Sequence, residues 1–121
     1  MISVPVYFFS GTKTNIDIES YTNAREYITI LMNLLQFNIT KIPYYGLYEI
    51  CTKTDASEER FLEDDERILD TIALWNKEKE ENRNSSLDFK MYLKIKRILC
   101  TWLRMKRFIH NKRVLIRGPI S

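Results

Sequence analysis

Residues 61–79 read FLEDDERILDTIALWNKEK and place four consecutive acids before an apolar stripe that ends at Trp75. Such a run could bind calcium, supply paired catalytic carboxylates or begin a helix. The segment lacks the alternating oxygen ligands and central glycine of a calcium loop. Nothing beside it offers a nucleophile, an oxyanion hole or a second base. We therefore predict that Asp64, Asp65 and Glu66 lie at a helix start, where acids cap free N–H groups and favour the dipole.

Few other residues of the chain have the chemistry of a catalytic or metal site. There is one histidine, His110, and the two cysteines, Cys51 and Cys100, have no metal-ligand spacing. A zinc site or a histidine-based triad needs more partners than these residues supply. The three glycines form no phosphate-binding loop. We predict a protein that is not an enzyme, with no cofactor or metal, whose thiols are reduced in a cytoplasmic setting.

Charge divides the 121 residues into two unequal parts. Residues 1–89 hold all 16 acids and nine of the 19 lysines and arginines, whereas residues 90–121 hold the other ten bases and no acid. No apolar run approaches the length of a membrane-spanning helix, and the apolar N-terminus lacks the basic flank of a signal peptide. The pattern indicates an acidic domain, residues 1–97, followed by a basic tail, residues 98–121.

The basic tail is the best candidate for a binding site. Ile98, Trp102, Met105 and Ile109 recur at helical spacing with basic residues beside them, which predicts a basic amphipathic helix. Such a helix suits a protein partner, a neighbouring domain or an anionic lipid surface, or it packs on its own acidic domain. Nucleic acid is not favoured, because the acidic body would repel phosphate. The predicted partner-binding residues are Arg97, Trp102, Arg104, Met105, Lys106, Arg107 and Ile109.

Hydrophobic periodicity in the body indicates strands and helices around one sheet. Residues 3–9 and 14–20 alternate about a turn at Gly11, which predicts a hairpin. Residues 44–53 and 89–96 also predict strands, and the alternation in 89–96 leaves lysines on its outer face. Helices are predicted at two places. The first has an apolar face of Ala24, Tyr27, Ile28, Leu31, Leu34 and Leu35, and the second has Ile68, Leu69, Ile72 and Trp75.

Asn23 and Glu26 resemble a capping box at the start of the first helix. Residues 54–60 and 78–86 predict a polar loop and a flexible connector. The order of elements favours an α+β fold of the ubiquitin-like β-grasp type, a mixed sheet packed on one long helix and followed by the basic helical tail.

The ordered set of segments resembles the first, ubiquitin-like lobe of a FERM domain, most of all that of unconventional myosin tails. PVYFFSGTKTNIDIESYTNAREY is similar to the family's opening hairpin and helix start, and GLYEI to its next strand. ERFLEDDERILDTIALW resembles its Leu-x-x-Asp-Glu segment, and FKMYLKIKR its last strand. The likeness covers about residues 3–97, and the segment after Ile98 does not resemble a second lobe.

The resemblance implies a protein-interaction module of a cytoskeletal or motor-associated protein, which binds cargo, a regulator or neighbouring lobes. Ras-associating domains share the fold and are the related alternative, with a small GTPase as partner. Those domains commonly present a basic second strand, whereas the second strand here carries Asp17 and Glu19. A structural subunit of a large assembly is a further alternative.

Overall fold

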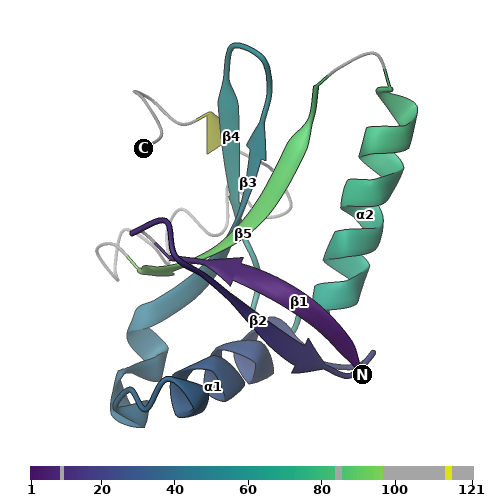
Figure 1. The fold of residues 1–121 in the computed structure, drawn as a ribbon. Coiled ribbons are helices and arrows are strands. Elements are labelled where there is room, and N and C mark those ends of the chain that lie inside the picture. The colour runs from purple at the N-terminus through teal and green to yellow at the C-terminus, as the bar shows by residue number, and fades with distance from the viewer. Residues whose placement is uncertain (9, 84–85, 97–113, 116–121) are drawn as a thin grey trace.

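The structure is a computed structural model that describes residues 1–8, 10–83, 86–96 and 114–115. Its described elements form an α+β fold, as predicted (Figure 1). In chain order they are β1 (Ile2–Tyr7), β2 (Lys13–Ile18), α1 (Ala24–Leu34), the 3-10 helix η1 (Ile39–Tyr44), β3 (Tyr45–Thr52), β4 (Ser57–Phe61), α2 (Ile68–Glu81), β5 (Asp88–Ile95) and β6 (Val114–Leu115).

The strands form one mixed sheet in the order β2-β1-β5-β3-β4-β6. β1 and β2 pair antiparallel over their full length, and β5 pairs antiparallel with β3 from Asp88 to Ile95. The two pairs meet where β1 and β5 run parallel, with Tyr7 opposite Tyr92. The first strand, β1, and the late strand, β5, are therefore neighbours inside the sheet, which confirms the predicted ubiquitin-like arrangement.

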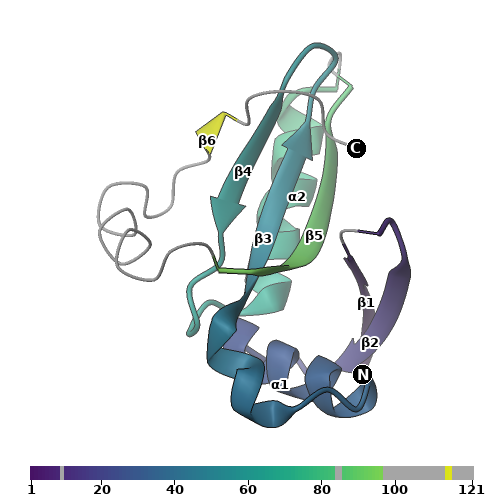
Figure 2. The same cartoon turned by 90° about the vertical axis from the view of Figure 1, so that its left-hand side faces the viewer.

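The apolar core lies between one face of this sheet and the two helices. Figure 2 shows α2 behind β3, β4 and β5, and α1 beneath them. Helix α1 buries five side chains, while α2 buries only two, Ile68 and Thr71. The core side chains are Val4, Val6, Ile16, Ile18, Ala24, Tyr27, Ile28, Leu31, Met32, Leu47, Leu62, Ile68, Met91 and Leu93. Alternate residues of β1, β2 and β5 enter this core, as their two-residue period predicts.

Local signals account for the first hairpin and for the start of α1. Gly11 has φ +89° at the β1–β2 turn, a conformation that glycine adopts without a Cβ clash. The side chain of Asn23 accepts from the N–H of Glu26 at 2.8 Å, and Glu26 Oε1 accepts from the N–H of Asn23 at 3.1 Å. The predicted capping box is confirmed, and it satisfies two backbone N–H groups at the helix start.

Three predictions about the body are wrong. Residues 57–61 form β4 where a polar loop was predicted, and α2 continues to Glu81, inside the predicted connector. Two apolar side chains predicted to face the core are exposed, because Leu34 lies at the end of α1 and Ile95 at the end of β5. The apolar periodicity of a helix or strand includes its last residue, but that residue can extend past the side chains on which the rest of the element packs.

The predicted helical tail falls almost wholly outside the described residues. Only Val114–Leu115 is described there, as strand β6, which pairs antiparallel with Glu58 and Glu59 of β4. The boundary that we predict between residues 97 and 98 remains a prediction.

Candidate functional site

The residues predicted to bind a partner lie outside the described part of the chain. The structure therefore neither brings them together nor separates them. They are Arg97, Trp102, Arg104, Met105, Lys106, Arg107 and Ile109. What the described residues do bring together is a polar cluster beneath α2, a basic–aromatic sheet face, and two strand edges.

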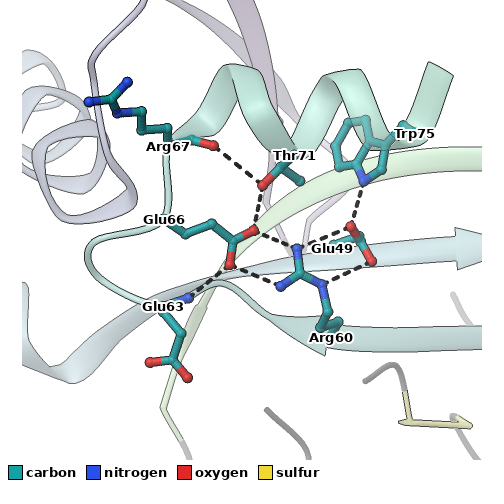
Figure 3. Close-up of polar contacts among 7 residues, drawn as sticks. All are labelled: Glu49, Arg60, Glu63, Glu66, Arg67, Thr71 and Trp75. Atoms are coloured by element: carbon teal, nitrogen blue, oxygen red, sulfur yellow. Dashed lines mark hydrogen bonds and ion pairs between the residues drawn. The ribbon is translucent and has the colours of Figure 1, made fainter. Parts of the chain in front are cut away.

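The polar cluster is centred on Arg60 of β4 (Figure 3). Its guanidinium lies between two carboxylates. Arg60 donates to Glu66 at 2.6 and 2.9 Å and to Glu49 of β3 at 3.4 Å. The side chains of Arg60 and Glu49 are 8% and 1% exposed, so this is a buried ion pair. Breaking such a pair from one side leaves an uncompensated buried charge, so the cluster fixes β3, β4 and the segment before α2 relative to one another.

Glu66 connects the cluster to helix α2. It accepts from the Thr71 hydroxyl at 2.5 Å and from the N–H of Glu63 at 3.4 Å (Figure 3). Thr71 lies one turn inside α2 and is 1% exposed. The buried hydroxyl and the partly buried carboxylate therefore satisfy each other, and they hold the first turn of α2 in place.

The prediction that the acidic run caps α2 is wrong. The N-cap of α2 is Arg67, whose side chain makes no capping hydrogen bond. The backbone of the run instead caps the start of α1. The carbonyl of Glu66 accepts from the N–H of Ala24, and the carbonyl of Asp64 accepts from the N–H of Arg25. The run is a bridge between the starts of two helices, with its Glu66 side chain turned toward Arg60.

Trp75 closes the other end of the cluster. Its indole Nε1 donates to Glu49 Oε1 at 2.6 Å, and its ring stacks on Phe89 of β5 with centroids 5.5 Å apart. Trp75 is half-buried against the apolar core. We predicted an apolar role for this side chain, and the indole N–H adds a polar contact to a carboxylate that is itself buried.

The ionisation of the cluster follows from its contacts. Burial disfavours the charged form of Glu66, but the hydrogen bonds from Arg60 and Thr71 outweigh it and lower the pKa of this carboxyl. Burial likewise opposes the charge of Arg60, and its contacts with Glu66 and Glu49 raise the pKa above the ordinary value. Both groups are charged at neutral pH, so neither is poised to transfer a proton.

The chemistry of the cluster is therefore that of a structural connection. In the described part of the chain, no group of three or more histidine, cysteine or carboxylate side chains could hold a metal ion. Across the same residues, every buried side-chain nitrogen or oxygen has a hydrogen-bond partner. No helix in the described ranges has the length and apolar character needed to cross a membrane.

The sheet face opposite the helices carries lysines over aromatic rings. The ammonium of Lys90 lies 5.1 Å from the ring centroid of Tyr7, and that of Lys94 lies 4.7 Å from Tyr48. Tyr7 also contacts Tyr92, with centroids 5.6 Å apart. The predicted basic outer face of β5 is thus confirmed. Lys90 pairs with Asp88 and Lys94 with Glu59, so acids on the same face offset part of the positive charge.

The β2 end of the sheet has mixed charge. Lys13 and Asp17 are exposed on β2, and Glu19 is exposed just after it. An acidic partner would meet Asp17 and Glu19 as like charges there, which disfavours association.

The comparisons with known proteins agree with this fold. Residues 1–98 match the family model described as an RA like domain, and the chain therefore belongs to the RA-like domain family. No curated protein matches the sequence.

Two solved structures of the myosin VII MyTH4-FERM MF2 domain from Dictyostelium discoideum are similar in fold. One superposes with TM-score 0.65 at 15% identity, and its mutant 1 form with TM-score 0.63 at 14% identity. Each superposition covers 92% of this chain, but only 21% and 22% of the myosin chains. The resemblance to the ubiquitin-like lobe of FERM and Ras-associating domains is confirmed at the level of fold.

Sequence reasoning missed the buried ion-pair cluster. A signal was present, because Glu49 interrupts the apolar strand GLYEICT at a position whose neighbours Leu47 and Cys51 face the core. An acid at an inward position requires a buried cation, and Arg60 lies directly opposite in the β3–β4 register. The partner escaped notice because the segment containing Arg60 was predicted to be a loop.

Proposed function

We propose that this chain is a non-catalytic protein-interaction module of a cytoplasmic, cytoskeletal or motor-associated protein. The observation that carries the proposal is the match of residues 1–98 to the RA-like domain family, on a fold similar to part of a myosin MyTH4-FERM structure. The polar cluster supports it, because the charged groups inside the domain are used for internal pairing. The module binds cargo, a regulator or a neighbouring lobe.

The basic tail supplies the contact in this proposal. Its apolar stripe, Ile98 to Ile109, is flanked by bases, and residues 1–89 hold all 16 acids of the chain. The described body already has a sheet, two helices and a core, so it does not need a second apolar stripe to complete those layers. The proposed contact residues are Arg97, Trp102, Arg104, Met105, Lys106, Arg107 and Ile109.

Binding of a small GTPase is the second candidate function. The RA-like family match favours it, and the exposed Asp17 and Glu19 at the second strand oppose it. A panel of small GTPases carrying a non-hydrolysable GTP analogue separates the two candidates. We expect no saturable binding to the full chain, and nucleotide-dependent binding would instead support the Ras-associating function.

The tail contact is tested with the full chain and two variants. One variant replaces Trp102, Met105 and Ile109 by alanine, and the other replaces Arg104, Lys106 and Arg107 by glutamine. Proteins captured from a cytoskeletal extract are identified at 0.05 M and 0.5 M salt. We expect one partner that is retained by the full chain at low salt, lost by both variants and weakened at high salt, because salt screens charge attraction.

A matched charge change in the body provides the control. Lys13→Gln, Lys41→Gln and Lys77→Gln remove three exposed lysines of the body, and a triple variant should keep the partner. Vesicles with and without anionic lipid are a further arm, in which selective binding to the anionic vesicles would favour a lipid contact. If the tail variants retain every captured protein, the tail does not carry the interaction.

A further inference from the structure

The β4 edge of the sheet already accepts an added strand. β4 is five residues long and pairs with β3 along all of it, whereas β6 contributes only Val114 and Leu115 on its other side. Figure 2 shows β6 beside β4, at the opposite end of the sheet from β2. Backbone pairing at a sheet edge is a recurrent mode of peptide recognition, because main-chain hydrogen bonds do not depend on side-chain identity.

Acidic side chains lie on both faces of this edge. Successive strand residues point to opposite faces, so Glu58 and Glu59 flank the incoming backbone on either side. They are 29% and 23% exposed. Glu58 pairs with Lys53 at 2.7 Å, and Glu59 pairs with Lys94. An added strand with basic side chains can share these carboxylates.

The resident strand has the matching composition but a short paired length. Residues 112–117 read KRVLIR, an apolar centre with bases on both sides. β6 sets Val114 opposite Glu59 and Leu115 opposite Glu58. Two paired residues make a small contact, since each backbone hydrogen bond contributes little net stability.

We propose that the β4 edge is a docking site for an extended segment of a partner protein, and that β6 is the intramolecular strand that the partner displaces. The partner segment has an apolar centre and basic residues that meet Glu58 and Glu59, and it pairs with more of β4 than the two residues of β6 do. This site is separate from the predicted tail contact at residues 97–109, and it does not rest on the proposed function.

A labelled peptide and a proline variant of the full chain test the site. Leu115→Pro removes a backbone N–H and disfavours strand pairing of the resident segment. The probe is a fluorescent peptide with the sequence of residues 111–117, followed by anisotropy. We expect it to bind the Leu115→Pro chain about tenfold more tightly than the unaltered chain, because the competing strand is removed.

Matched charge reversals locate the contact. Glu58→Lys, added to Leu115→Pro, should abolish peptide binding, whereas Asp17→Lys, an equal reversal on exposed β2, should leave it unchanged. Amide chemical shifts should move in Ser57–Phe61 on peptide addition. Loss of dispersed amide signals would identify a variant that fails to fold, and Glu59→Gln then replaces Glu58→Lys with an expected weakening.

Three results would overturn the proposal. The first is equal binding of the peptide to the Leu115→Pro and unaltered chains. The second is binding that survives Glu58→Lys while the β4 amide signals stay unmoved. The third is concentration-dependent dimerisation of the Leu115→Pro chain through the same amides, which would make a second copy of this chain the occupant.

Discussion

The two helices cover the same face of the sheet, yet they are held to it by different interactions. Helix α1 inserts Tyr27, Ile28 and Leu31 among the apolar side chains of β1 and β2. Helix α2 fully buries one apolar residue, Ile68, and packs Leu69, Ile72 and Trp75 against the core while leaving them partly exposed. Its Thr71 and Trp75 add hydrogen bonds to Glu66 before the helix and to Glu49 of β3. The first contact depends on apolar burial, and the second adds a paired charge cluster to partial apolar burial.

The difference predicts that the two helices respond to different perturbations. Apolar burial is non-directional and nearly independent of pH and salt. A buried ion pair depends on geometry and on the presence of every partner, and removal of one partner costs more than the pair contributes. Charge substitutions should therefore affect α2 first, and cavity-forming substitutions should affect α1 first.

The largest effect is expected at Arg60. Arg60→Met keeps the aliphatic stem but removes the guanidinium that pairs with both Glu49 and Glu66. We expect the free energy of unfolding to fall by roughly 3–5 kcal/mol. Urea denaturation followed by circular dichroism measures the loss. A triple variant with Glu49→Gln and Glu66→Gln added should recover part of it, and no recovery would mean that packing of the guanidinium, not its charge, matters.

Leu31→Ala tests the apolar contact of α1. Leu31 is 0% exposed in the core, and its truncation leaves a cavity. We expect a loss of about 3 kcal/mol in the same denaturation experiment. The loss should be equal at pH 7 and pH 5, since Leu31 lies in a cluster of buried side chains that contains no carboxylate or histidine. Leu34→Ala, at an exposed position of the same helix, is the matched control and should cost little.

Trp75→Phe separates the hydrogen bond of the indole from its stacking. The phenyl ring can still stack on Phe89, but Glu49 loses the donor that lies 2.6 Å from it. We expect a cost of about 1–2 kcal/mol, the usual effect of removing one partner of a buried hydrogen bond. Trp75→Ala should cost more, because the stacked ring is lost as well. Equal costs for both variants would show that the hydrogen bond supplies the whole contribution.

The smallest effect is expected from pH, through Glu66. Its pKa is lower in the folded protein than the ordinary 4.5, so its contribution to stability is complete above that value. The contribution is lost as the pH falls through the lower folded pKa. In Glu66→Gln, stability should be lower at pH 7 and should fall less steeply between pH 5 and pH 3. Parallel curves for the two proteins would contradict the assignment.

The apolar contact of α1 was predictable from sequence, and the charged contact of α2 was not. Residues such as Val4, Ile16 and Leu31 recur at strand or helix spacing, and the structure places them in the core. β4 was missed because its sequence, SEERF, has no apolar alternation. Its polar side chains are accommodated by partners from β3, β5 and residue 66, which are distant in sequence or on another element.

At the candidate site too, contacts between residues that are distant in sequence were not predicted. The acidic run of residues 63–66 was correctly interpreted as structural and wrongly assigned to the cap of α2. Its backbone caps α1 because the chain returns there, with Ala24 donating to the carbonyl of Glu66. Because every residue type has a backbone carbonyl, a contact made by carbonyls cannot be predicted from the side chains in the sequence.

The parallel contact of β1 with β5 also sets the order in which the domain can form during synthesis. Tyr7 pairs with Tyr92, so the sheet cannot join its two halves until the ribosome has made nearly all of residues 1–96. The β1–β2 hairpin and α1 can form earlier from local contacts, but the β1 edge of the hairpin gains its second strand only when β5 is present. Closing so long a loop makes this step slow relative to hairpin formation. A nascent chain stalled before residue 88 should therefore present an open β1 edge and engage chaperones.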